Sequence, residues 1–443
     1  MGKDVYKTLS SEGMRRNKFI NHYVLMRSEM EKLNWPSEFP GTYWIDEKEE
    51  NAVVDVVKNG SLFRYYGLNN AKYVDDFETK AKQFYGSKYA LGVNSGTGAL
   101  STCMQTLGVG PGCEVIVPSF MWVATIGAVI TNNAIPVLCE VDESFCLDPV
   151  DLEKKITSKT KLIVPVHIAG CPCDMDSIMA IAKKHNVAVL EDCAQCNGGS
   201  YKGKKVGTIG DMGIFSLQLN KNMTCGEGGL IITDNEKLYF KAFSSHDMGL
   251  VRVKGRLATP DAYAICWGQG RRMAELCGAV ASVQIDKLAH IINSMVKSKN
   301  RIKDGLTNIE GLSFRKLNDA NGDSGPFLIM ILDDADKAIS VADKMKENGL
   351  NNIFRITDYG LHIYYNIPSL INKVPLSPVG NPWSLAENKS SNYDYNKGAC
   401  PKSDDLFARS ILLPIPSKLT VEQERQAVEI IKKTMADKWA IGF

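Results

Sequence analysis

The sequence lacks the features that mark membrane-spanning and nucleic-acid-binding proteins. Its 443 residues contain no run of about 18 or more uncharged apolar residues, so we expect no membrane span. The formal net charge is only +2, and no basic run with interleaved aromatic residues is present, so we expect no nucleic-acid partner. The first residues, M-G-K-D-V-Y-K, lack the apolar core of a signal peptide, which predicts a cytoplasmic protein.

Signals for metal ions and disulfides are weak, although the chain has twelve cysteines. Cys171 and Cys173 are closely spaced, as are Cys193 and Cys196, but no second pair follows at the spacing of a zinc ribbon. Cysteines in a cytosolic chain of this length are usually reduced and buried as small hydrophobic residues. We therefore predict no metal site.

The apolar pattern predicts an α/β fold. Short apolar segments of strand length alternate with segments of helical spacing, which is typical of a mostly parallel sheet covered on both faces. Apolar residues between Phe19 and Leu33 have roughly helical spacing, so we expect a helix in an N-terminal arm. We predict three parts, namely this arm, a large domain and a smaller C-terminal α/β domain: 1–45, 46–285 and 286–443.

One lysine is distinguished by its surroundings. Lys221 lies between a strand-like segment that ends near Ser216 and a glycine-rich turn, in F-S-L-Q-L-N-K-N-M-T-C-G-E-G-G. A partly desolvated amine in such a place can form a Schiff base with a carbonyl cofactor. Because most of the 52 Lys and Arg of the chain are expected on the surface, Lys221 alone is weak evidence. Three upstream segments supply the other groups that such a lysine needs.

The first of these segments is E-D-C-A-Q at 191–195, after the apolar run 187–190. We interpret the run as a buried parallel strand, and an acid at its carboxyl end faces the crevice where α/β sheets bind ligands. Asp192 can there keep a proton on a heterocyclic nitrogen, which pyridoxal 5′-phosphate (PLP) requires. The alternative is that Asp192 is an ordinary turn former or helix cap.

The other two segments suggest a phosphate site and a ring-stacking site. In G-V-N-S-G-T-G-A-L, a strand leads into a helix, so free N–H groups and the hydroxyls of Ser95 and Thr97 can bind an anion that Gly96 lets approach. An ordinary helix N-cap explains the same pattern. In P-S-F-M-W-V-A-T, Trp122 can lie flat on a pyridine ring, although a lone Trp is more often a core residue.

Together these segments resemble the DegT/DnrJ-type sugar aminotransferases, which are PLP enzymes of fold type I. The resemblance runs from about Ile45 to the C-terminus and depends most on V-N-S-G-T, E-D-C-A-Q and S-x-Q-x-x-K-N-x-T-x-G-E-G-G. It implies a large domain with a mostly parallel central sheet and a smaller C-terminal α/β lobe. It also implies a PLP cofactor, transfer of an amino group from a donor such as L-glutamate to a keto- or aldehydo-sugar, and a homodimer with shared active sites.

The resemblance also implies roles for individual residues. Lys221 would bind PLP covalently, Asp192 would pair with its ring nitrogen, and Gln195 would lie near its phenolic oxygen. Trp122 would stack on the ring, and the phosphate would be held by Ser216 with the turn formed by Ser95, Gly96 and Thr97. Related proteins with His in place of Lys221 carry out dehydration, so lysine here favours transamination.

The sequence departs from the family at two positions. Gln218 stands where many members have His, and Gly270 stands where an asparagine usually reaches the phosphate of the partner subunit. Gln269 or Arg271 are candidates to replace that asparagine. The identity of the cross-subunit phosphate ligand is therefore open.

The substrate is less clearly indicated. Four polar residues in family-like blocks are candidates for substrate binding, and each has a structural role as its alternative: His246, Arg271, Arg272 and His362. The acceptor is expected to be a nucleotide-linked keto-sugar or a keto-sugar acid of lipopolysaccharide type, such as an 8-oxo octulosonate. Two other functions stay open, a PLP-dependent sugar dehydratase or lyase and a non-catalytic regulator with the same fold.

Overall fold

The computed structural model describes residues 33, 35–70 and 72–436. The helix predicted between Phe19 and Leu33 lies outside the described residues, apart from Leu33 itself. In the described part, no helix combines the length and the apolar composition that a membrane crossing needs. All twelve cysteines are unpaired, and most of them are buried, as the composition suggested.

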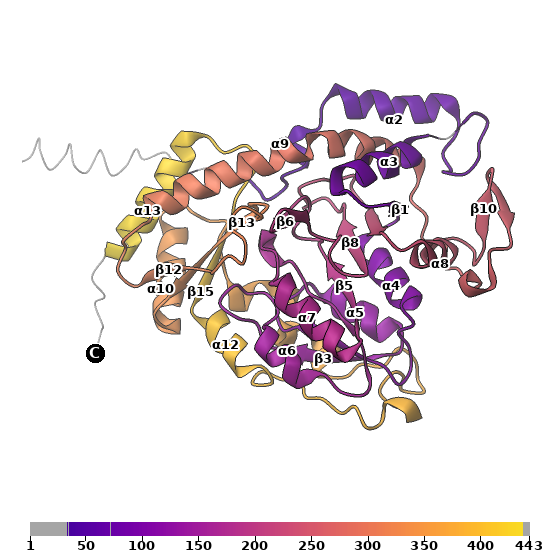
Figure 1. Ribbon diagram of the computed structural model, residues 1–443. Helices are drawn as coiled ribbons and strands as arrows, with labels where there is room; N and C mark the ends of the chain where they lie inside the picture. Colours follow the sequence, from indigo (N-terminus) through magenta and orange to yellow (C-terminus); the bar gives the residue numbers. More distant parts are fainter. Residues whose placement is uncertain (1–32, 34, 71, 437–443) are drawn as a thin grey trace, which may run out of the picture.

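A seven-stranded sheet forms the centre of the molecule (Figure 1), with the strand order β1-β9-β8-β5-β4-β2-β3. All of its members except β4, whose first two residues are not buried, are fully or nearly fully buried runs: β1 (Tyr89–Val93), β2 (Glu114–Pro118), β3 (Ile135–Cys139), β4 (Thr160–Ile163), β5 (Ala188–Asp192), β8 (Met212–Ser216) and β9 (Gly229–Thr233). Only β9 runs antiparallel to its neighbours. The mostly parallel α/β sheet predicted from the sequence is therefore confirmed.

Helices before, between and after these strands surround the sheet, and α2 packs on it only indirectly, through helix α9 (Glu275–Gly305). They are α2 (Glu47–Asn59), α3 (Tyr73–Tyr85), α4 (Gly96–Thr106), α5 (Val123–Thr131), α6 (Pro149–Lys155), α7 (Met175–His185) and α8 (Glu236–His246). Local signals define their ends, and α2 is a clear case. Asp46 and Glu49 form a capping box at its start, and Gly60 ends it with a φ of 65°, a backbone conformation that favours glycine.

A second, antiparallel sheet lies in the C-terminal part, in the order β12-β13-β15-β14. Its strands are β12 (Leu312–Phe314), β13 (Phe327–Leu332), β14 (Phe354–Arg355) and β15 (Ser410–Pro414). Packed near it are α10 (Ala335–Glu347), α12 (Pro401–Ala408) and α13 (Val421–Ala436). This is the smaller C-terminal lobe that the sequence predicts.

One long helix joins the two parts. Helix α9 (Glu275–Gly305) runs from α2 and α3 to α13 (Figure 1), so the predicted domain boundary at 285 falls inside it. The chain after β14 also returns to the large sheet, because Ile363, Tyr364 and Tyr395 belong to the same buried cluster as β2–β5 residues. The division of the chain at 285 stays a prediction. The part of the chain after 285 contributes to the buried cluster of the large sheet as well as to that of the C-terminal sheet.

Candidate active site

A cavity of about 470 Å³ lies where the parallel strands β1, β5 and β8 end. Asp192 is the last residue of β5, Ser216 is the last residue of β8, and Ser95 follows β1 by two positions. Its wall includes every residue that the sequence assigned to the cofactor and one of the substrate candidates: Ser95, Gly96, Thr97, Trp122, Asp192, Gln195, Ser216, Lys221 and His362. Segments far apart in the chain thus meet at one edge of the sheet.

Lys221 is the only lysine on the cavity wall among the described residues. The turn that carries it is fixed on both sides, since its N–H donates to the Gln218 carbonyl (3.0 Å) and its own carbonyl accepts from the Gly41 N–H (3.1 Å). Burial lowers the pKa of the Lys221 amine, while Asp192 and Glu38 partly oppose this effect. The amine therefore loses its proton more readily than an ordinary lysine does, as a nucleophile requires.

Asp192 presents a buried and well-oriented carboxylate to the same cavity. Its Oδ2 accepts from the Thr125 hydroxyl (2.7 Å) and its Oδ1 from the Ala194 N–H (3.1 Å), and only 3% of the residue is exposed. Burial raises the pKa of Asp192, and the bonds from Thr125 and Ala194 and the charge of Lys221 act in the opposite direction. A carboxylate in this state gains stability from a cationic N–H partner.

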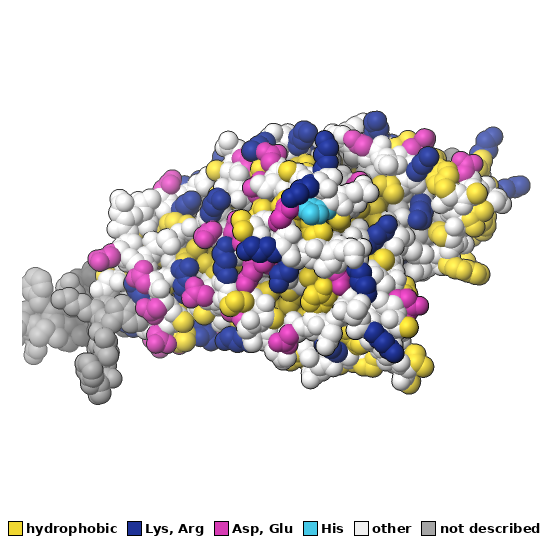
Figure 2. Space-filling view, turned by 60° about the horizontal axis from the view of Figure 1, so that its bottom comes forward, with side chains coloured by type: hydrophobic (Ala, Val, Ile, Leu, Met, Phe, Trp, Pro, Cys, Tyr) yellow, Lys and Arg dark blue, Asp and Glu magenta, His cyan; other side chains and the backbone are white. Residues whose placement is uncertain are grey.

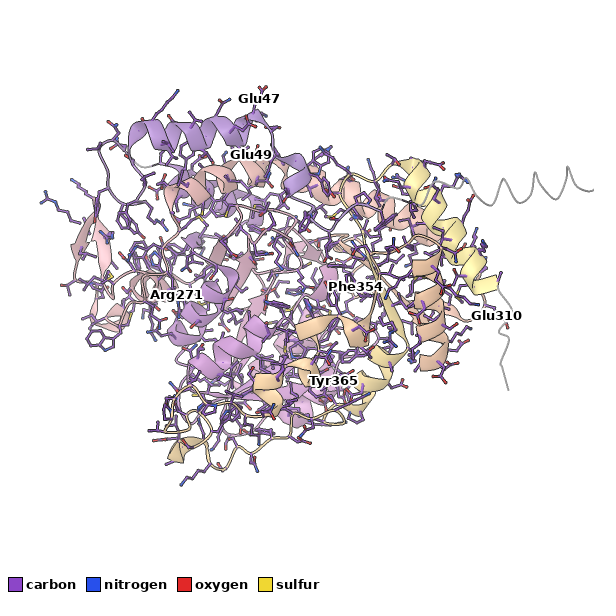
Figure 3. The ribbon with its side chains drawn as sticks, turned by 180° about the vertical axis from the view of Figure 1, so that it is seen from behind. Glu47, Glu49, Arg271, Glu310, Phe354 and Tyr365 are labelled. Carbon is purple, nitrogen blue, oxygen red and sulfur yellow. The ribbon has the colours of Figure 1, made fainter. Side chains whose placement is uncertain are left out.

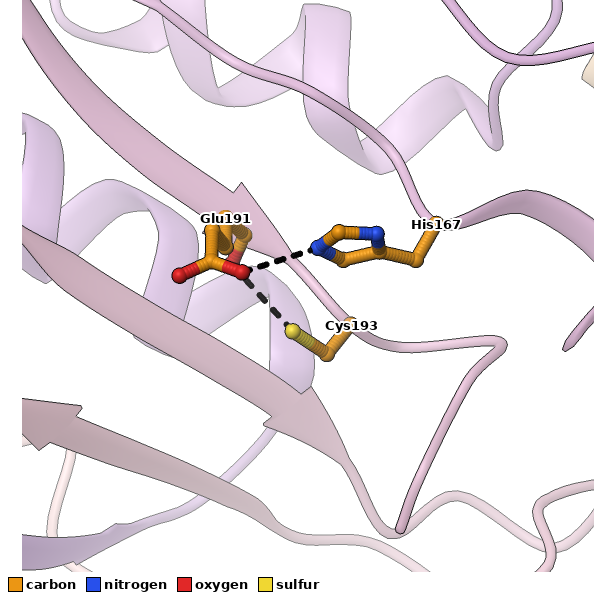
Figure 4. Close-up of side chains that lie close together, drawn as sticks. All are labelled: His167, Glu191 and Cys193. Carbon is orange, nitrogen blue, oxygen red and sulfur yellow. Dashed lines mark hydrogen bonds and ion pairs between the residues drawn. The ribbon is translucent and has the colours of Figure 1, made fainter. Parts of the chain in front are cut away.

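A buried pair behind Asp192 fixes the end of β5 (Figure 4). His167 Nδ1 accepts from the Cys173 N–H (2.9 Å), so the proton is on Nε2, which donates to Glu191 Oε2 (3.0 Å). Glu191 also accepts from the backbone N–H groups of residues 207, 209 and 210, at 2.6–2.8 Å. Cys193 lies close by, and its thiol points to the Glu191 carbonyl. Because protein donors already occupy both carboxylate oxygens, this group holds the strand end in place instead of offering free ligands to a metal ion.

The turn between β1 and α4 has the shape of a phosphate cradle. Ser95 caps α4 by accepting from the Gly98 N–H (2.9 Å), so the capping role left open by the sequence is present. A Cβ on Gly96 would lie 2.8 Å from the Ser216 Cβ, which shows how closely the two predicted phosphate-binding segments approach. Next to Ser216, the buried Asn197 Oδ1 has no hydrogen-bond partner among the described residues. Hydroxyls, a helix N-terminus and a close glycine fit a phosphate group.

His362 and Trp122 line another part of the cavity wall, next to Gln195. Gln195 Oε1 accepts from the Ala169 N–H (3.0 Å), so its amide nitrogen is the group that donates to His362 Nε2 (2.8 Å). His362 then carries its proton on Nδ1 and donates to the Tyr359 carbonyl (3.0 Å). Burial lowers the pKa of His362 to about 3, which agrees with this neutral form. Trp122, 44% exposed and with its ring centre 4.8 Å from that of His362, has a free face for a planar ligand.

The remaining three substrate candidates lie outside this cavity. His246 is buried, with Nε2 2.9 Å from the Tyr65 hydroxyl, and Arg272 forms an ion pair of 2.6 Å with Asp247. Arg271 donates to the Thr102 hydroxyl (3.2 Å) and lies on the side of the hairpin β10 (Val251–Val253) and β11 (Arg256–Ala258), as Figure 3 shows. A substrate role for these three residues stays a prediction.

Several wall residues were not identified from the sequence. Thr125 and Asn197 lie within or just after the motifs, so the motif positions themselves were a usable signal. Glu38 and Tyr359 come from distant segments without any local pattern, and only the folded chain brings them to Lys221.

A lysine and an acid that share one cavity with a glycine-containing helix N-terminus, at the strand ends of an α/β sheet, are the groups that a PLP-dependent enzyme needs. The chain belongs to the DegT/DnrJ/EryC1/StrS aminotransferase family, whose sequence profile matches residues 44–432. Its cofactor is pyridoxal 5′-phosphate, and its class of reaction is the amination of a sugar. The family resemblance drawn from the motifs is confirmed.

Individual relatives agree with this assignment. The chain is 32% identical to GDP-perosamine synthase of Vibrio cholerae over 280 residues, which are 63% of this chain and 72% of that protein. It is 37% identical to GDP-perosamine synthase of Escherichia coli O157:H7 over 226 residues, which are 51% of this chain and 60% of that protein. The crystal structure of 3-amino-5-hydroxybenzoic acid (AHBA) synthase is similar with a TM-score of 0.75 at 26% identity, covering 92% of this chain and all of that one.

Proposed function

We propose that this sugar aminotransferase moves the amino group of L-glutamate to the carbonyl carbon of a nucleotide-linked keto-sugar. The observation that carries the proposal is that Lys221 and Asp192 line the same cavity. Asp192 ends β5 and Lys221 follows β8, and these two strands are adjacent in the sheet. When bound, PLP supplies a carbonyl that an amine can attack and a cationic ring that withdraws electrons. The chain itself has to hold this group, orient it and move protons.

Each of these tasks has a residue suited to it. Ser95, Thr97 and Ser216 would hold the phosphate, and the Asp192 carboxylate would keep the ring nitrogen protonated. Trp122 would cover one ring face, and the Gln195 amide, oriented by its bond to His362, would lie at the ring edge. Together these contacts account for orientation without any metal ligand.

Lys221 would have two roles. Its amine would bind the cofactor, and after release by the amino donor it would move a proton between substrate and cofactor carbons. General acid–base catalysis of this kind contributes about 10²–10⁴-fold to a rate when the pKa is near the working pH. Burial shifts the pKa of Lys221 downward, in the direction that such a role needs.

The acceptor could belong to either of two classes of sugar, and the same cofactor could also serve a reaction other than transamination. The similarity to two GDP-perosamine synthases supports a nucleotide-linked keto-sugar. A keto-sugar acid of lipopolysaccharide type, such as an 8-oxo octulosonate, is the second candidate acceptor. A dehydratase or lyase would use the same cofactor without net amino transfer, and a lysine at position 221 favours transamination over dehydration.

Addition of excess L-glutamate to the protein with bound PLP should release 2-oxoglutarate in an amount equal to the cofactor present. The visible absorbance of the bound cofactor should be lost in the same reaction, because the amino group stays on the enzyme. Both signals are measured in a single-turnover experiment, with D-glutamate as the control donor. A spectrum that does not change would favour a lyase, and a protein that binds no PLP would favour a regulator.

We also propose that the active protein is a homodimer that shares its active sites. Exposed hydrophobic side chains cluster around the β10–β11 hairpin (Figure 2), and Leu68 and Trp267 are 88% and 90% exposed. The hairpin packs on the neighbouring segment, because a Cβ on Gly255 would lie 2.5 Å from the Tyr65 carbonyl oxygen. Large apolar patches of this kind mark protein–protein contact sites.

Trp267→Glu should weaken self-association at least about tenfold, because the charged group would enter an apolar interface twice in a symmetric dimer, at a cost of about 1 kcal/mol or more for each copy. Sedimentation equilibrium at micromolar concentration measures this change. Val421→Glu is the matched control, because Val421 is 67% exposed on α13, at the other end of the molecule. A wild-type protein that sediments as a monomer would refute the proposal.

A further inference from the structure

The cavity has a second wall that the cofactor does not require. It is formed by the segment before α2 and by residues in or near the C-terminal sheet: Glu38, Pro40, Pro326, Phe327, Tyr359 and Ile415. Apart from the Tyr359 hydroxyl and the Glu38 carboxylate, these side chains are apolar. Glu38 precedes residue 44, where the match to the family begins, so the family assignment gives it no role.

The segment that carries Glu38 is firmly attached to the site. The Ser417 hydroxyl donates to the Pro40 carbonyl (2.7 Å), and the Gly41 N–H donates to the Lys221 carbonyl (3.1 Å). A Cβ on Gly41 would lie only 3.0 Å from that carbonyl oxygen, so glycine permits this close approach. These contacts, two and three residues after Glu38, hold the segment that carries it next to the turn of Lys221.

The Glu38 carboxylate is incompletely satisfied. Its Oε2 is shielded from solvent and has no hydrogen-bond partner among the described residues. Glu38 and Lys221 line the same cavity; burial raises the pKa of Glu38, and the charge of the Lys221 amine lowers it. A buried oxygen without a donor is costly, which indicates that a ligand supplies the donor.

We propose that Glu38 accepts a hydrogen bond from a hydroxyl of the acceptor sugar, and that the ring bound in this cavity is neutral and hydroxylated. The apolar residues Pro40, Pro326 and Phe327 suit the C–H face of such a ring, and a carboxylate beside them binds hydroxyls and repels a second carboxylate. This inference rests on the proposed function. It favours nucleotide-linked keto-sugars, whose ring is uncharged, over keto-sugar acids.

The test uses the variants Glu38→Gln and Glu38→Ala. In each, the half-reaction with the amino donor and the half-reaction with the acceptor sugar are measured separately. The acceptor probes are GDP-, UDP- and dTDP-linked 4-keto-6-deoxyhexoses, with an 8-oxo octulosonate as the acidic comparison. We expect kcat/KM for the best neutral acceptor to fall about tenfold in Glu38→Gln and about a hundredfold in Glu38→Ala, chiefly through KM. The half-reaction with L-glutamate should not slow in either variant, because the donor has no sugar hydroxyl to lose and its carboxylates meet less negative charge, and Glu38→Gln should shift the preference between acceptors from the neutral sugars toward the octulosonate.

Glu47→Gln is the matched control, because Glu47 is exposed at the start of α2 and points away from the molecule (Figure 3). Equal losses in both half-reactions, or no loss for the acceptor, would overturn the inference. So would a wild-type enzyme that reacts with L-glutamate but aminates none of the neutral sugars, a result that needs no variant and leaves the aminotransferase function intact. If the wild-type enzyme does not react with L-glutamate, the proposed function itself fails.

Discussion

Lys221→Ala is expected to abolish aminotransfer while leaving the fold intact. Its amine is the only primary amine on the cavity wall among the described residues, so no neighbour can replace it as the cofactor-binding group or as the proton carrier. Loss of a general acid–base alone costs up to about 10⁴-fold in rate, and loss of the covalent link adds to this. The variant should also lack the visible absorbance of lysine-bound PLP.

The measurements are steady-state turnover, the absorbance spectrum after addition of PLP, and thermal unfolding. Lys237→Ala is the control, because Lys237 is exposed on α8 and its replacement leaves the site untouched. Thermal unfolding near the wild-type temperature would show that the loss is chemical. Turnover above about a hundredth of wild type would contradict the assignment of Lys221.

The second large effect is expected for Asp192→Asn. Asparagine has nearly the same shape and can keep the contacts with Thr125 and Ala194, but it carries no charge to hold a proton on the ring nitrogen. Removing one such electrostatic contact typically lowers kcat by about 10²–10³-fold. Without this charge, the ring nitrogen would lose its proton more easily. We therefore expect the decrease in kcat to become larger as the pH rises from about 6 to about 9.

The pH profile of kcat distinguishes this role from simple damage to the site. Asp343→Asn on the exposed face of α10 is the control and should leave turnover unchanged at every pH. The variant should still bind PLP through Lys221. A uniform loss at all pH values, accompanied by loss of bound PLP, would show that Asp192 is needed for folding of the site and not for its charge.

The meeting of most candidate cofactor residues in one cavity could be predicted from the sequence, because each of them lies at or soon after the end of its own strand. Ser95, Asp192 and Ser216 lie at or just after the ends of β1, β5 and β8. The carboxyl ends of parallel strands meet at one edge of a sheet, so local patterns are enough to bring these residues together. The burial of the strands, in turn, follows from their apolar runs.

The substrate side was less accessible to sequence reasoning. His362 was one of four candidates, and the fold placed it on the cavity wall while His246, Arg271 and Arg272 became part of contacts elsewhere. Nothing in their local sequence separates these four residues. Their neighbours in space belong to other elements, and the local pattern does not contain them.

The sequence by itself determined the class of fold, the cofactor motifs and the lysine, because hydrophobic periodicity and strand-end positions are local properties. Only the tertiary structure decided which further residues line the cavity, since Glu38 and Tyr359 lie more than a hundred residues from Lys221 in the chain and share its cavity through the fold. Helix α9 packs against both halves and crosses the boundary that the alternation of strand-like and helical segments placed at 285. Such contacts depend on the shape of the whole molecule, and no local pattern encodes them.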